Sequence, residues 1–288
     1  PEALLRHPDL KEVPRVGLVA GSKTASAADL SVFAAEARQW PDGTVVRTVT
    51  GTQSASLHPL WIYVQVSEGN PAASRVVGRV RAADGAEAGT FVKAVQPFAV
   101  AGGSGYELAV PVGAGKWLVD LALLGEGGPL AVTTIEAETE AVAADGTFIS
   151  PFIWGVDVRQ EVNAHLGDPF NVGGWHALPN VGDRYTSKDS VSYFCYVVRP
   201  GLPAAAPAAD GATAAEPQPK LELLVKVSHE GAVLGELPAQ AVTVSRVVDE
   251  LYMFGNALPL AGFRKPGSYV LELTLRDTIS GAARSAQI

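Results

Sequence analysis

The chain has 288 residues, of which 47% are hydrophobic and 18% charged, a balance typical of folded globular domains. Its length predicts two domains, each able to bury its own core. The 22 basic and 30 acidic residues give a net charge of -8 without a basic cluster, which argues against a nucleic-acid partner. One cysteine, Cys195, excludes an internal disulfide and a zinc site of several cysteines, and no apolar run is long enough to span a membrane.

Residues 17–24, GLVAGSKT, are similar to the phosphate-binding P-loop, in which glycines let backbone N–H groups surround a phosphate. Ser22 stands where that motif requires glycine, so we interpret the segment as a strand followed by a turn that caps a helix. A P-loop nucleotidase built on Lys23 stays an alternative only if residues 13–40 belong to a parallel sheet.

The clearest helical pattern covers residues 26–40. Ser26 is a suitable N-cap, Asp29 lies in the first turn, and Pro41 ends the pattern. Residues 1–43 are therefore predicted to be an extension with one helix. Its apolar stripe consists of Leu30, Phe33, Ala34 and Ala37.

From residue 44 onward, alternation of apolar and polar residues with period two predicts strands separated by turns. AADG (82–85) and SHEG (228–231) have the composition of hairpin turns. The predicted strands are 60–66, 75–85, 106–112, 116–124, 191–198, 220–231, 240–248 and 268–277.

The two halves of the chain are similar to each other. Without gaps, residues 108–124 align with 260–276 at an offset of 152, and the hairpin glycines Gly85 and Gly231 differ by 146 positions. We interpret this as a tandem duplication. The predicted fold is all-β, with two tandem immunoglobulin-like antiparallel β-sandwiches over residues 44–140 and 146–288.

Residues 199–219, RPGLPAAAPAADGATAAEPQP, are rich in proline and alanine and poor in large apolar side chains. The internal repeat places them between two strands of the second domain. We therefore expect a long, mobile hairpin loop rather than a linker between domains.

Six motifs follow each other from residue 113 onward, namely GAGKWLVDLALL, FISPFIWG, GDPFNVGGWHALPN, SVSYFCYVVRPG, LLVKVSHEG and LPLAGFRKPGSYVLELTLRDTISG. Their order resembles the C-terminal β-sandwich region of bacterial von Willebrand factor A-related and GWxTD-type proteins. The resemblance covers roughly residues 106–288 and implies an exported, surface or periplasmic protein with no known chemistry in these domains. Two signatures of these proteins are absent. Asp29-Leu30-Ser31-Val32-Phe33 lacks the last serine of the metal-binding motif Asp-x-Ser-x-Ser. Gly174-Trp175 is followed by His176-Ala177-Leu178, which does not match the signature Gly-Trp-x-Thr-Asp. The matching residues are Pro266, Gly267, Tyr269, Asp277, Ser280 and Gly281.

No catalytic, metal-ligating or cofactor-binding residue is predicted, and the chain is not expected to be an enzyme. The histidines form no H-E-x-x-H pair, and no G-x-S-x-G sequence presents a serine. Cys195 lies mid-strand among aromatic residues, which predicts a buried thiol. Glu136, Glu138 and Glu140 are interpreted as solvated side chains, and a calcium ion in a loop stays open.

Residues 167–180, GDPFNVGGWHALPN, form the candidate interaction loop, with Phe170, Asn171, Trp175 and His176 as its candidate residues. Aromatic side chains exposed on rigid loops can recognise sugars or protein partners. The alternative is a loop folded back over the sandwich, with Trp175 closing its open end.

These observations predict a non-catalytic structural or protein-interaction module of an exported bacterial surface or periplasmic protein, as a subunit of a larger assembly. Unpaired edge strands offer sites for a protein partner or for self-assembly. The alternative function is a carbohydrate-binding accessory domain that uses the loop aromatics. The sequence implies no cofactor and no membrane span, and a glycan ligand stays open.

Overall fold

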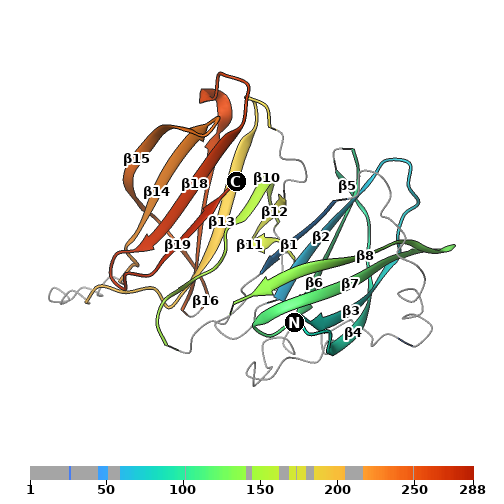
Figure 1. Ribbon diagram of the computed structural model, residues 1–288. Coiled ribbons are helices and arrows are strands. Elements are labelled where there is room, and N and C mark those ends of the chain that lie inside the picture. The colour runs from blue at the N-terminus through green and yellow to red at the C-terminus, as the bar shows by residue number, and fades with distance from the viewer. Residues whose placement is uncertain are drawn as a thin grey trace. The chain divides into compact units, whose positions relative to one another are not determined.

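The computed structural model is all-β, and it contains no α-helix in the ranges that it describes (Figure 1). The predicted helix, apart from Ser26, and the GLVAGSKT segment lie outside these ranges. The structure describes Ser26 and residues 45–50, 59–100, 102–140, 145–161, 169–172, 174–179, 185–204, 217–248 and 250–288.

The chain divides into two compact units. Unit 1 comprises residues 1–141 together with 160–183, and unit 2 comprises residues 142–159 together with 184–288. The candidate interaction loop, which the sequence places within the second domain, therefore groups with unit 1. Every strand pair described within the units is antiparallel, whereas a P-loop domain requires parallel strands.

Unit 1 contains two four-stranded sheets that share one core (Figure 1). The first has the order β1-β2-β6-β5, built from Val45–Thr50, Pro59–Ser67, Gly103–Pro111 and Phe98–Val100. The second has the order β4-β3-β7-β8, built from Glu87–Ala94, Arg75–Ala82, Gly115–Gly125 and Gly128–Thr139.

Alternate residues of these strands point into the core of unit 1. Leu60 and Ile62 of β2 enter it from the first sheet, and Val119 and Leu121 of β7 from the second. All four side chains are at most 1% exposed. At about 1.5–3 kcal/mol for each fully buried large aliphatic side chain, this burial is the main favourable term for the unit.

Unit 2 repeats the strand order of unit 1. Its sheets have the orders β10-β13-β17-β16 and β15-β14-β18-β19, so that each of these strands takes the place of the corresponding strand of unit 1. The short β9 (Phe148–Ile149) pairs with β13 in addition. The bounds are Ile153–Gln160, Ser190–Val198, Leu251–Pro259 and Ser245–Val248 for the first sheet, and Ala232–Val242, Leu221–His229, Tyr269–Asp277 and Ala283–Gln287 for the second.

The core of unit 2 also draws on both of its sheets, including β13 and β17 from one and β14 and β18 from the other. Cys195 of β13 is 0% exposed, which confirms the predicted burial, and this burial raises the pKa of its thiol. The strand predicted over 240–248 was wrong, because it is two segments. β15 ends at Val242 in one sheet and β16 begins at Ser245 in the other, while Val244 turns into the core between them.

The proline- and alanine-rich segment lies between β13 and β14, as the repeat predicts. These strands belong to different sheets, so the segment joins two layers and the predicted hairpin loop was wrong. Residues 205–216 lie outside the described ranges.

The strands β7 and β18, which occupy the same place in their units, begin with the same corner. In unit 1 the indole N–H of Trp117 donates a hydrogen bond of 3.0 Å to the carbonyl of Gly113, four residues earlier. In unit 2 the hydroxyl of Tyr269 donates a bond of 2.8 Å to the carbonyl of Lys265, also four residues earlier. Gly115 has φ +147° and the aligned Gly267 has φ +144°, a conformation that favours glycine.

Asp277 ends β18 and organises the turn that follows. Its carboxylate accepts backbone N–H bonds from Gly201, Ile279 and Ser280, and the side chain is buried. Burial alone would raise the pKa of Asp277, but these bonds hold the pKa below its ordinary value.

Three cross-strand pairs place a phenylalanine ring over a glycine. The tightest is Gly78 of β3 opposite Phe91 of β4, where a Cβ added to Gly78 would lie 2.0 Å from Phe91 Cζ. The ring therefore occupies the space above the glycine and closes this edge of the unit 1 core. The other pairs are Gly105 with Phe98 and Gly255 with Phe194.

We predict that Gly78→Ala lowers the free energy of unfolding by about 1–3 kcal/mol, because the added methyl displaces the Phe91 ring from a packed core. Denaturant unfolding measures the change. The double variant Gly78→Ala/Phe91→Leu should recover part of the loss, because leucine leaves room for the methyl. Equal stability of Gly78→Ala and the parent chain would contradict this packing.

Candidate functional site

The candidate interaction loop is largely turned inward. Phe170 is 0% exposed, and its ring centroid lies 5.6 Å from that of Trp61 and 6.2 Å from that of Tyr63. The carboxamide oxygen of Asn171 accepts a bond of 3.1 Å from the backbone N–H of Gly174, which closes the turn between β11 (Asn171–Val172) and β12 (Trp175–Pro179).

His176 fixes β12 to the first sheet of unit 1. Its Nε2 lies 3.0 and 2.9 Å from the two carboxylate oxygens of Glu107 on β6. This contact is an ion pair when the imidazole is protonated. The ring also meets Phe98 edge-on, with centroids 6.3 Å apart. Burial, and to a smaller extent the charge of Glu107, raise the pKa of the neighbouring Tyr63 phenol.

Only Trp175 among the four candidate residues presents a large aromatic surface to solvent, with 40% exposure. Phe170 instead packs on Trp61 and Tyr63 of β2, Asn171 holds its own turn, and His176 contacts β5 and β6. Trp61 and Tyr63 are not among the candidate residues predicted from the sequence. The run LWIYVQV contained the signal, because apolar residues at both odd and even positions indicate a strand covered on both faces.

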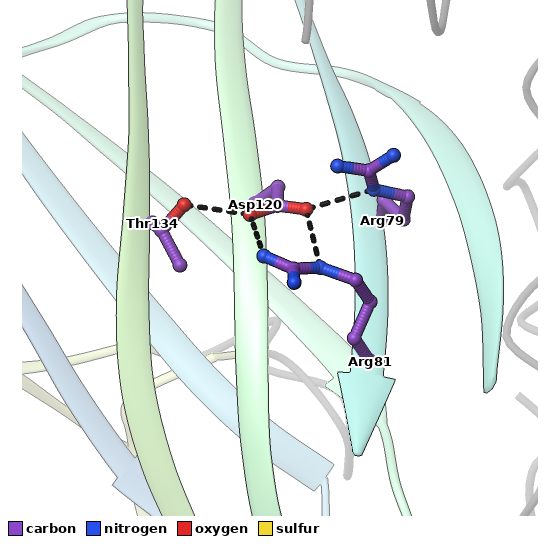
Figure 2. Close-up of polar contacts among 4 residues, drawn as sticks. All are labelled: Arg79, Arg81, Asp120 and Thr134. Carbon is purple, nitrogen blue, oxygen red and sulfur yellow. Dashed lines mark hydrogen bonds and ion pairs between the residues drawn. The ribbon is translucent and has the colours of Figure 1, made fainter. Parts of the chain in front are cut away.

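A cluster of charged residues lies on the other sheet of unit 1. Asp120 is on β7 between the inward-facing Val119 and Leu121, so its side chain projects from the opposite face of the sheet. Figure 2 shows Arg79 and Arg81 reaching it from β3 and Thr134 reaching it from β8.

Three side chains, Arg79, Arg81 and Thr134, donate four hydrogen bonds to the Asp120 carboxylate. Oδ2 accepts from Arg79 Nε at 2.8 Å and from Arg81 Nε at 2.9 Å, while Oδ1 accepts from Arg81 Nη2 at 2.8 Å and from Thr134 Oγ1 at 2.6 Å. Burial alone would raise the pKa of Asp120, but these bonds hold the pKa below its ordinary value. The carboxylate is thus a structural anion that joins three strands, and it is poorly suited to accept a proton near neutral pH.

Other ionisable groups in the described parts are also held by packing. The ammonium of Lys93 donates to the carbonyl of Ala109 across the two sheets of unit 1, and burial lowers its pKa to about 8. Glu136, Glu138 and Glu140 are exposed, which confirms the predicted solvated side chains. No group of three or more histidine, cysteine or acidic side chains in the described ranges could hold a metal ion.

Unit 1 contains a cavity of about 50 Å³ beside Ala73, Tyr106 and Leu123, which is too small for an organic ligand. Across the parts of the chain that are described, no helix has the length and apolarity needed to cross a bilayer.

The most unusual surface in unit 2 is the edge strand β15. Every residue from Ala232 to Ala241 is exposed, and β15 has β14 as its single strand neighbour among the described elements. Three large apolar side chains lie along it, namely Val233, Leu234 and Leu237, which are 56%, 61% and 49% exposed. An edge that combines unpaired backbone groups with apolar side chains is a template for association.

The sequence predicts association through edge strands but does not distinguish β15 as an edge. Its residues, AVLGELPAQAV, include a proline and only one ionisable side chain, Glu236. Pro238 is compatible with an edge strand, because a strand paired on both sides requires the N–H that proline lacks.

No protein-family model matches the sequence, and no curated protein is significantly similar to it.

We predict that Phe170→Ala destabilises the chain by about 3–5 kcal/mol, because it empties a fully buried aromatic position against Trp61 and Tyr63. Trp175→Ala should cost much less, since that ring is 40% exposed. Thermal and denaturant unfolding of the two variants measure the difference. A larger loss for Trp175→Ala would contradict the assignment of Phe170 as the side chain that holds the loop.

The Asp120 network predicts an acid-sensitive contribution to stability. A carboxyl whose pKa is lower in the folded than in the unfolded state stabilises the fold above its unfolded pKa, and this contribution is lost as pH falls through the folded pKa. Asp120→Asn should therefore lower the free energy of unfolding by about 1–3 kcal/mol at neutral pH, with a smaller difference from the parent near pH 3. Urea unfolding across this pH range tests the effect, and a pH-independent difference would contradict it.

Proposed function

We propose that this chain is a non-catalytic structural or protein-interaction module of an exported bacterial surface or periplasmic protein, and that it works as a subunit of a larger assembly. The observation that carries the proposal is the edge strand β15, with its exposed Val233, Leu234 and Leu237. The partner is a protein, either a different chain or further copies of this one.

The proposal includes an immunoglobulin-like fold for each unit and an origin by tandem duplication. The orders β1-β2-β6-β5 and β4-β3-β7-β8 correspond to the A-B-E-D and C′-C-F-G sheets of that architecture. Unit 2 has the same orders, and the Trp117 and Tyr269 corners correspond to the tyrosine corner of such domains.

The proposed location rests on the resemblance to bacterial von Willebrand factor A-related and GWxTD-type proteins. Its motif residues Pro266, Gly267, Tyr269 and Asp277 lie around the corner and turn of β18, where Tyr269 and Asp277 make the backbone hydrogen bonds described above. The resemblance therefore coincides with residues that shape the fold of unit 2.

A structural role also fits the use that the chain makes of its polar side chains. The Asp120 carboxylate joins three strands, Asp277 holds a turn, and the imidazole of His176 holds β12 against Glu107. In these clusters the hydrogen bonds of the polar side chains connect segments of the chain to each other, which is typical of structural domains.

A carbohydrate-binding accessory domain is the second proposal, and the 40% exposure of Trp175 favours it. An exposed indole can stack on the apolar face of a sugar ring. Sugar binding would quench tryptophan fluorescence in the parent chain and not in Trp175→Ala.

We predict that the purified chain forms discrete oligomers, or co-elutes with a protein from native extract, in size-exclusion chromatography with light scattering. The double variant Val233→Lys/Leu234→Lys should lose this association, because two charges on the edge oppose burial of the strand. Leu202→Lys is the matched control, since Leu202 is 46% exposed elsewhere in unit 2.

A chain that is monomeric at all concentrations and co-elutes with nothing would contradict the interaction function. Association that survives in Val233→Lys/Leu234→Lys would remove β15 as its site.

A further inference from the structure

The edge strands β4 and β15 occupy the same place in their units and share a register with the neighbouring strand. Phe91 of β4 lies opposite Gly78, and Leu237 of β15 lies opposite Val225. Two residues earlier, Gly89 lies opposite Val80 and Gly235 opposite Val227.

The two edges differ in how well they close the core. Phe91 is 1% exposed and Val80 is 0% exposed, so β4 seals unit 1. Leu237 is 49% exposed, although Val225 beside it belongs to the core of unit 2. The opposite residues differ as well, because Gly78 leaves space for the ring in unit 1, whereas Val225 carries a side chain at the corresponding position of unit 2.

Leu237 therefore faces the core side of the sheet while half of its surface stays in water. Val233 and Leu234 precede Leu237 on the same strand, and their exposed fractions are still larger. β15 has eleven residues, and the backbone groups of alternate residues point away from β14, where a further strand can pair with them.

We propose that an extended segment of a different protein adds antiparallel to β15 and places an aromatic side chain against the exposed side of Leu237. This inference rests on the proposed interaction function and names the mode of binding. The added strand covers the exposed side of Leu237 with an aromatic ring, as Phe91 covers the corresponding edge of unit 1, and its backbone supplies hydrogen bonds to the free edge.

The chemistry of the edge favours a different protein over a second copy of this chain. Two β15 strands paired with each other would offer glycine and leucine on the core-facing side, with no aromatic ring. Such pairing would also bring two Glu236 side chains and two Pro238 residues to the interface. Because Glu236 is the only ionisable side chain of β15, the segment that fits is apolar on its core-facing side and neutral or basic on the other.

The sequence of β4 itself provides a suitable probe. A fluorescently labelled peptide with the sequence of residues 86–95, AEAGTFVKAV, carries Phe91 on one face of the strand and the neutral residues Thr90 and Val92 on the other. Titrated with the full-length chain, it should give saturable binding by anisotropy. The matched peptide in which Phe91 is replaced by alanine should bind about tenfold more weakly, because it removes the buried ring.

Variants of the protein locate the binding site. Leu237→Lys should weaken binding of the AEAGTFVKAV peptide about tenfold, whereas Leu224→Lys should bind it like the parent. Leu224 is 40% exposed on the adjacent strand β14 but points to the opposite face from its neighbours Leu223 and Val225 in the core. Both positions are exposed, so neither charge disrupts packing of the core.

Three results would overturn the inference: no binding up to about 1 mM peptide, equal binding of the phenylalanine and alanine peptides, or dimerisation of the chain through β15 that excludes the peptide. If the peptide fails while Val233→Lys/Leu234→Lys still abolishes association of the chain, strand addition is wrong and the interaction function stands. If association itself is absent, the interaction function fails first.

Discussion

The structure depends on removing from water the apolar side chains that alternate along its central strands. A strand such as β2 or β14 places every second residue on one face, and that face can be buried only against a second sheet. Each unit meets this requirement with two sheets around one core. The turns, the corner residues and the glycines opposite phenylalanine are the local solutions that let the sheets approach each other.

The burial pattern explains which parts of the fold the sequence predicts. The strands that cross a core, β2, β7, β13 and β18, alternate clearly and are confirmed within two residues of their predicted ends. β4 and β10 are interrupted by glycine or polar residues, and their sequences, EAGTFVKA and IWGVDVRQ, do not distinguish a strand from a loop. The bend at Val244 was missed because a residue that turns into the core between two sheets has the same pattern as one inside a strand.

The candidate sites show a different limit. The loop around Phe170 and Trp175 is predicted as an interaction site because aromatic residues lie among glycine and proline. Its contacts with Trp61 and Glu107 join positions far apart in the sequence. Whether such a ring is buried depends on which strand lies beneath it. The exposure of β15 is harder still to predict, since AVLGELPAQAV is as apolar as many buried strands and only the order of strands in the sheet makes it an edge.

Cys195 gives the chain an internal reporter of one unit. It is the only thiol in the sequence and lies fully buried on β13 in the core of unit 2. A buried thiol of raised pKa reacts slowly with alkylating agents, so its labelling reports the opening of that core. The rate of labelling can therefore follow the breathing of unit 2 without any engineered probe, while unit 1, whose strands carry no cysteine, stays silent in the same experiment.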